Sequence, residues 1–294
     1  MRSGPLAALG CYTIWGLFPL YLKLLAGVSA LELVAHRSAW ALVLLLLLLA
    51  AQRRLGALRQ ALASPAALRV FVPSALLLSL NWLLYVYAVN GGRVLEASLG
   101  YFINPLVNVA LGFLFLRERL RAAQWLAIAL AAAGVAWLTW QVGALPWVSL
   151  ALALSFGVYG LLRKTAPLGA LEGLALETTL LAPLALAGVA WFMGPGHGAF
   201  ASGSLGIDLL VVGTGVLTAI TLVLFAYAAR QVTLATLGLM QYLSPSLQFV
   251  LAVYVFNEPF DTGRGVGFAL IWAGLLVYSV HGLVQMRQAR VAST

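Results

Sequence analysis

The chain has 294 residues, of which 63% are hydrophobic and 9% are charged, and its formal net charge is +9. A soluble domain is about half apolar and about a quarter charged, so this composition excludes a water-soluble protein. The basic residues are scattered between apolar blocks and never form the dense stripe that phosphate binding needs, so we expect no nucleic acid partner.

The apolar residues fall into segments separated by clusters of charge, glycine and proline. A helix that crosses a bilayer needs roughly 20 apolar residues. The predicted spans lie near residues 6–25, 33–51, 70–90, 94–116, 122–140, 146–162, 171–192, 207–228, 232–256 and 264–284. The sequence therefore predicts an all-α membrane protein with ten transmembrane helices. We expect neither a cleavable signal peptide nor a separate soluble domain.

The distribution of basic residues predicts the orientation of these helices. If the amino terminus is cytoplasmic, thirteen of the seventeen Lys and Arg residues fall in cytoplasmic segments. Only Lys23, Arg93 and Arg264 fall outside, and Arg37 lies within a span. This is the asymmetry that the positive-inside rule describes. We therefore expect a multi-pass protein of the bacterial inner (plasma) membrane with both termini in the cytoplasm.

A shift of 140 residues aligns the two halves of the sequence without a gap. Pro105 then meets Pro245, Glu118 meets Glu258, and the glycine at 134 meets the glycine at 274. Because each half holds five predicted spans, an odd number, the second half must enter the membrane in the opposite orientation. The sequence thus predicts two inverted five-helix repeats, at residues 1–142 and 143–294. This architecture is typical of alternating-access carriers.

Ionisable residues within the spans are candidate functional groups, because each costs several kcal/mol at membrane depth unless it is paired or hydrated. Glu32, His36 and Arg37 cluster at the start of the second span. This cluster would present a cation to an anionic substrate. The alternative is an internal ion pair between Arg37 and Glu177, its counterpart at the 140-residue shift, that holds the halves together.

The fourth and ninth spans each carry a polar stripe and a proline. Helical spacing places Glu96, Asn104 and Asn108 within one broad stripe, beside Tyr101. The ninth span carries Gln241, Ser244 and Gln248. Paired stripes of this kind favour a hydrated central cavity, and the alternative is ordinary hydrogen bonding between helices.

Aromatic and carboxylate residues complete the set of candidates. Asn81 and Tyr85, with Trp15 and Trp82, could wall a pocket for a planar or amphipathic solute, although packing is the simpler interpretation for each aromatic ring. Glu118 and Glu258 end matching spans. We expect them to be structural and to complement the positive end of the helix that follows.

The sequence lacks the motifs of several other functions. Three dispersed histidines and one cysteine, Cys11, give no metal-ligand spacing, and no nucleophile–base pair is evident, so we expect no enzyme, metal or other cofactor. There is no phosphate-binding Gly-Lys-Ser or Gly-Lys-Thr loop for ATP. Energy for transport would therefore come from a proton, ion or solute gradient.

Several stretches in both halves resemble one family of membrane transporters. They are residues 15–21, 35–37, 81–82 and 92–106 in the first half and residues 176–178 and 241–249 in the second. These stretches, and most specifically GRVLEASLGYFINPL at 92–106, resemble the RarD branch of the EamA family in the drug/metabolite transporter superfamily. The resemblance implies a ten-helix, two-repeat secondary transporter, and related branches export amino acids and other metabolites.

The sequence therefore predicts a secondary transporter, an exporter or permease of small metabolites or drugs, that works by alternating access. The candidate substrate-binding residues are Arg37, His36, Asn81, Tyr85, Tyr101, Asn104, Gln241 and Gln248, and the candidates for proton coupling are Glu96 and Glu177. The main alternative is a flippase for lipids or lipid-linked substrates, which a lateral opening between helices would distinguish.

Overall fold

The computed structural model describes residues 3–90, 94–142, 147–194, 196–255 and 262–291. All regular secondary structure in these residues is helical. The helices are α1 (Ser3–Lys23), α2 (Ala30–Ala51), α3 (Leu55–Ala63), α4 (Pro65–Asn90), α5 (Val94–Leu116), α6 (Ala122–Val142), α7 (Trp147–Thr165), α8 (Ala170–Phe192), α9 (Leu205–Gln231), α10 (Leu234–Gln241), α11 (Leu243–Tyr254) and α12 (Thr262–Val291). Long apolar helices are what a bilayer requires, because only intrahelical bonds satisfy the backbone there.

Each predicted span coincides with a helix, with two differences. The short helix α3 was not predicted, and the span expected at 232–256 is divided into α10 and α11 at Tyr242. Pro245 contributes to this division, because it has no N–H to donate to the carbonyl of Gln241. Seven helices in the described part of the chain are long and apolar enough to cross a membrane, and a shorter apolar segment covers Gly265–His281. The number of ten spans stays a prediction.

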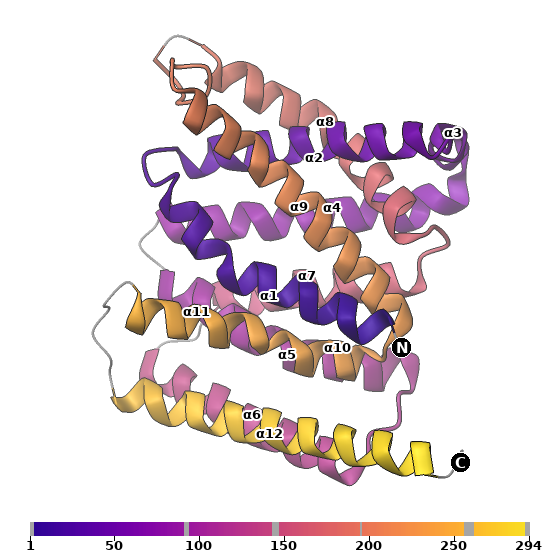
Figure 1. Ribbon diagram of the computed structural model, residues 1–294, viewed down its shortest axis with the longest axis vertical. Helices are drawn as coiled ribbons and strands as arrows, with labels where there is room; N and C mark the ends of the chain where they lie inside the picture. Colours follow the sequence, from indigo (N-terminus) through magenta and orange to yellow (C-terminus); the bar gives the residue numbers. More distant parts are fainter. Residues whose placement is uncertain (1–2, 91–93, 143–146, 195, 256–261, 292–294) are drawn as a thin grey trace.

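The connections between helices gather at two ends of the molecule (Figure 1). The start of α1, the helix α3, the α5–α6, α7–α8 and α9–α10 connections and the end of α12 lie at one end. We call it the basic end, because these segments carry most of the Lys and Arg residues. The α1–α2 and α8–α9 connections lie at the opposite end. The predicted asymmetry of charge thus corresponds to two separate ends of the structure.

Charged side chains join the connections at the basic end to one another. Arg54 forms an ion pair of 2.6 Å with Glu172. The Arg230 guanidinium donates hydrogen bonds of 2.7 Å to the carbonyls of Ala166 and Leu168. Lys164 donates to the carbonyls of Ala229, at 3.0 Å, and Val232. These bonds hold the α7–α8 connection against the end of α9.

Glu118 caps a helix, but not the one that we expected. Its carboxylate accepts hydrogen bonds from the backbone N–H groups of Leu234, at 2.7 Å, and Ala235, at 3.0 Å. These groups begin α10, whereas the prediction named the helix that follows Glu118 in the chain. The correction arises because α5 and α10 pack against each other and bring the two ends together. Glu258 lies outside the described residues.

Helix positions repeat along the chain with a constant offset. α2, α4, α5 and α6 begin at residues 30, 65, 94 and 122, and α8, α9, α10 and α12 begin at 170, 205, 234 and 262. Each start in the second set lies 140 residues after its counterpart. α6 and α12 also approach reciprocally, because a Cβ at Gly134 would lie 2.6 Å from the Gly267 carbonyl oxygen and one at Gly274 would lie 2.6 Å from that of Ala127. Glycine is needed at both crossing points.

Candidate functional site

A cavity of about 260 Å³ lies between the helices. Residues of α1, α2, α4, α5, α7, α9, α10 and α11 line it, and the described residues of α3, α6, α8 and α12 do not. The lining positions lie toward the end opposite the basic end in α1, α2, α4, α5 and α7, and near the middle of α9 and of the α10–α11 pair. Both halves of the sequence therefore contribute to the walls.

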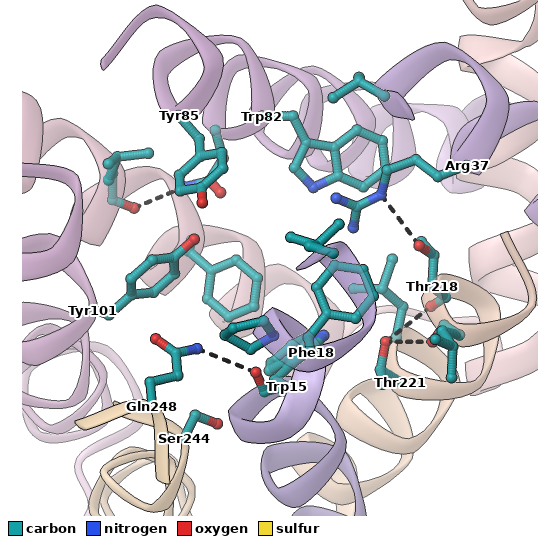
Figure 2. Close-up of a pocket in the computed structure, with 18 of the residues that line it drawn as sticks. Trp15, Phe18, Arg37, Trp82, Tyr85, Tyr101, Thr218, Thr221, Ser244 and Gln248 are labelled. Carbon is teal, nitrogen blue, oxygen red and sulfur yellow. Dashed lines mark hydrogen bonds between the residues drawn. The ribbon is translucent and has the colours of Figure 1, made fainter. Parts of the chain in front are cut away.

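Arg37 of α2 is held in a fixed orientation at the cavity wall. Its Nε donates a hydrogen bond of 3.1 Å to the hydroxyl of Thr218 on α9. The guanidinium carbon lies 4.8 Å from the centroid of the Trp82 ring on α4 (Figure 2). Thr218 is itself fixed, because its hydroxyl donates to the Thr214 carbonyl at 2.7 Å. A cation thus lies at the cavity wall within cation–π distance of an aromatic ring.

Amide side chains connect the cavity walls to the backbone of neighbouring helices. The Asn81 amide nitrogen donates to the Leu152 carbonyl and the Ser155 hydroxyl, both at 2.9 Å. The Gln248 amide nitrogen donates to the Trp15 carbonyl at 3.1 Å (Figure 2). These bonds tie α4 to α7 and α11 to α1, so each amide presents its oxygen as the acceptor that remains.

A second amide cluster lies between α5 and α10. Asn108 donates from its amide nitrogen to Gln241, at 3.0 Å, and to Asn104, at 3.2 Å. Asn104 and Gln241 line the cavity, while Asn108 is fully buried beneath them. The stripes predicted on the fourth and ninth spans therefore meet each other. Interhelical bonding and cavity lining, which the sequence left as alternatives, are both present.

Aromatic rings form much of the remaining wall. Tyr85 and Tyr101 lie across the cavity from Arg37 (Figure 2), with their ring centroids 6.2 Å apart. Trp15 contacts Phe156 edge to face, with centroids 5.7 Å apart. The rings give the cavity flat apolar surfaces suited to a planar solute.

Most of the predicted substrate-binding residues lie together. Seven of the eight line the cavity: Arg37, Asn81, Tyr85, Tyr101, Asn104, Gln241 and Gln248. Their contact with a substrate stays a prediction.

His36 is not among the lining residues, and the predicted cluster of Glu32, His36 and Arg37 is divided. Glu32 accepts hydrogen bonds from the backbone N–H groups of Ala199, at 2.8 Å, and Phe200, at 2.9 Å. His36 packs on the Phe200 ring at 4.4 Å. Consecutive residues on a helix point about 100° apart, so His36 faces the α8–α9 connection while Arg37 faces the cavity.

The alternative that the sequence left open, an ion pair between Arg37 and Glu177, is contradicted by the structure, because Glu177 pairs with Arg163. Glu177 lies toward the basic end of α8, where its carboxylate is 3.6 Å from the Arg163 guanidinium. It also accepts hydrogen bonds from the hydroxyls of Ser74 and, at 3.3 Å, Tyr159. The shift of 140 residues relates sequence positions, but it does not place them in contact. The Glu96 side chain lies outside the part of the structure described.

The sequence interpretation missed a column of threonines on α9. Thr214, Thr218 and Thr221 line the cavity, and their hydroxyls donate to carbonyls of the preceding helical turn. Such self-bonded hydroxyls are common in apolar helices, so they gave no signal by type alone. The internal repeat did offer a signal, because Thr221 is the counterpart of Asn81 at the 140-residue shift.

Comparison with known proteins identifies the family of this helical arrangement. The EamA-like transporter family model matches residues 2–140. An uncharacterized transporter of Pseudomonas aeruginosa is 48% identical over 288 residues, which cover 98% of this chain and 97% of that protein. The chain belongs to the EamA-like transporter family.

Other relatives place this EamA-like chain among the RarD proteins. Protein RarD of Streptomyces exfoliatus is 45% identical over 98% of this chain and 92% of that protein. A solved crystal structure aligns with a TM-score of 0.72, covering 95% of this chain and 99% of that chain at 21% identity. At that identity the likeness extends to the fold alone. The relatives support a multi-pass membrane transporter, as the sequence predicted.

Proposed function

We propose that this chain is a secondary transporter that exports small amphipathic metabolites or drugs across the bacterial inner membrane by alternating access. The observation that carries the proposal is a mostly apolar, aromatic-walled cavity that also holds polar side chains, with walls from both halves of the sequence. It is displaced away from a basic end that is closed by buried charged residues. In each of its two states, a carrier has a central cavity that is closed toward one side of the membrane.

The two halves act as inverted five-helix repeats that together cross the membrane ten times. Four pairs of helix starts separated by 140 residues support this architecture, as do the reciprocal glycine contacts of α6 and α12. The stretch matched by the family model, residues 2–140, ends near the boundary at 142 that the repeat implies. Such repeats can rock about a shared interface and expose a site to one side at a time.

The basic end lies in the cytoplasm, with both termini, because connecting segments rich in Lys and Arg remain inside. The cavity is displaced toward the opposite end of five of its helices. This arrangement therefore corresponds to an outward-facing state.

Two layers close the path from the cavity to the cytoplasm. The first is aromatic: Phe225 is fully buried, with its ring centroid 5.8 Å from that of Trp15 and 5.9 Å from that of Tyr159. The second is the buried pair of Glu177 and Arg163, which the Tyr159 hydroxyl joins to the first layer. An inward-facing state requires that both layers separate.

Sequence counterparts occupy the open side and the closed side. Glu177 is the counterpart of Arg37 at the 140-residue shift, and Ser74 is the counterpart of Thr214. Arg37 and Thr214 line the cavity, whereas Glu177 and Ser74 are buried and bonded to each other. In an alternating-access carrier, equivalent parts of the two inverted repeats differ in this way, because one part lies on the open side while the other lies on the closed side.

Glu177 is the candidate for proton coupling among the residues whose side chains are described. A proton on its carboxyl group would remove the negative charge that pairs with Arg163, and would weaken the inner closure. Glu96 is the other candidate for proton coupling, and for this residue the proposal rests on the sequence alone.

The test compares solutes released by cells that express the wild-type protein or an equally abundant Arg37→Ala variant, by untargeted mass spectrometry. Arg69→Ala is the matched control, because Arg69 is exposed and outside the cavity. We expect at least one compound to be released by the wild type and the control only, and to cross proteoliposomes that contain the wild type. Full transport by Arg37→Ala and Glu177→Gln would contradict the assignment, and movement that depends on a lipid headgroup would favour a flippase.

A further inference from the structure

Two of the described arginines, Arg163 and Arg37, lie within the helical interior, and they differ in how their charge is balanced. Arg163 is paired with Glu177 at 3.6 Å and donates to the Ala170 carbonyl at 3.0 Å. Arg37 has a hydroxyl and an aromatic ring as partners. Among the described residues that line the cavity there is no carboxylate. Because an unbalanced charge at membrane depth is costly, an anion beside Arg37 would be stabilised.

We propose that the transported solute is a small monoanion with an aromatic or flat apolar body, and that its anionic group binds the guanidinium of Arg37. The inference rests on the transport function proposed above and specifies its substrate class.

The geometry of Arg37 suits a carboxylate. Its Nε is engaged by Thr218 and its guanidinium carbon lies over the Trp82 ring, so the guanidinium is held in place before a ligand arrives. Among the described residues, no acceptor is bonded to its two terminal nitrogens. A pre-oriented guanidinium can then donate two parallel hydrogen bonds to the oxygens of one carboxylate.

Four of the other polar side chains in the cavity wall already donate to the protein, so an anion gains less from them than from Arg37. The amide nitrogens of Asn81 and Gln248 donate to the protein. The hydroxyls of Thr214 and Thr221 donate to backbone carbonyls at 2.6 and 2.8 Å. These groups leave acceptor oxygens, which repel an anion.

The charge and size of the cavity limit the rest of the molecule. One guanidinium balances one negative charge, so a dianion would bring a second charge into the cavity without a described partner. A cation would face Arg37, and the lining residues that are described offer it no carboxylate. A volume of about 260 Å³ lies just below the usual range for ligand pockets, roughly 300–1,000 Å³. The pair of Tyr85 and Tyr101 can hold a single ring opposite Arg37.

The test measures binding to the purified full-length protein in detergent, by isothermal titration calorimetry. Three probes share one carbon skeleton and differ in charge: 3-phenylpropionate, its neutral amide and 3-phenylpropylamine. The fourth, the dianion benzylmalonate, adds one carboxylate to that skeleton. We expect the wild type to bind the monoanion at least tenfold more tightly than the other three. Arg37→Gln should lose at least tenfold in affinity for 3-phenylpropionate and change less than twofold for the amide. The control Arg69→Gln should match the wild type.

Equal affinity of the wild type for acid and amide, a stronger preference for the amine or the dianion, or binding of none of the four would overturn the inference. So would an Arg37→Gln protein that still prefers the acid. Proteoliposome flux separates the two proposals. Selective binding of the monoanion without flux would contradict the transport function but not the choice of a monoanion as ligand. Flux of neutral compounds alone would support the transport function and contradict the monoanionic substrate class.

Discussion

The side chain of Arg163 fits into the helix interface because residue 173 on α8 is a glycine. A Cβ at Gly173 would lie 2.9 Å from the guanidinium carbon and 2.7 Å from the ring of Phe71. The guanidinium also packs on the Phe71 ring, 5.3 Å from its centroid. A glycine and a carboxylate on α8 and an aromatic ring on α4 thus define one place for the cation, and the inner closure depends on this fit.

Gly173→Ala is therefore expected to displace Arg163 and weaken its pairing with Glu177. Overpacking of a tight interior costs about 1–3 kcal/mol, and breaking a buried ion pair costs about 3–5 kcal/mol when one partner is removed. We expect the midpoint of thermal unfolding to fall clearly for Gly173→Ala and further for Arg163→Gln. Gly27→Ala is the matched control, because a Cβ there meets nothing within 4 Å. An unchanged midpoint in both variants would show that the pair does not hold the structure together.

At the scale of the helix, α10 depends on a carboxylate from the other half of the chain. Its first N–H groups, which have no intrahelical partner, donate to Glu118. The carboxylate also lies at the positive end of the α10 dipole. A break between α10 and α11 leaves this short helix with few bonds of its own, so the cap is a large part of what fixes it.

Glu118→Ala should loosen the start of α10. Loss of a helix cap costs about 0.5–2 kcal/mol, and the local effect should exceed the global one because α10 has only 8 residues. Hydrogen–deuterium exchange should become faster in peptides that contain Leu234 and Ala235 and stay unchanged in α2. Arg119→Ala, at a neighbouring exposed position, is the control. Equal exchange in wild type and Glu118→Ala would mean that packing alone holds this helix.

The helices were predictable from the sequence, and their partners were less so. The bilayer requires apolar segments of a set length, and the 140-residue shift preserved their order, so the spans and the cavity-lining stripes could be located. The division of His36 from Arg37 depends on the direction in which each side chain leaves its helix. The partners of Glu177 and Glu118 depend on which helices pack together. A charge pattern along one chain does not contain that information.

At the scale of the whole molecule, the cavity and the ion pair lie at different depths along the same bundle. If the basic end is cytoplasmic, the cavity should be reached from outside the cell. Single cysteines can test this, because the native Cys11 is buried, donates to the Thr221 carbonyl at 3.2 Å and can be replaced by alanine first.

Ser244→Cys, in the cavity wall, should react with a membrane-impermeant maleimide in spheroplasts, and Ser74→Cys, beside Glu177, should not. Two exposed positions calibrate the sides: Ser202→Cys between α8 and α9 should react in spheroplasts, and Ala63→Cys at the end of α3 should react only in inside-out vesicles. Reaction of Ser244→Cys solely in inside-out vesicles would reverse the assigned orientation of the cavity.

The opposite charges of Arg37 and Glu177 at equivalent positions carry a consequence for the ancestry of the chain. If the repeats arose by duplication of a gene for one half, the ancestral protein worked as an antiparallel homodimer with the same residue at both positions. A dimer of one present half with itself would hold either two guanidinium groups or two carboxylates at this position, so it could not combine a cationic cavity with a paired inner closure. The divergence of this position therefore commits the two halves to separate tasks, and neither half could now replace the other by pairing with itself.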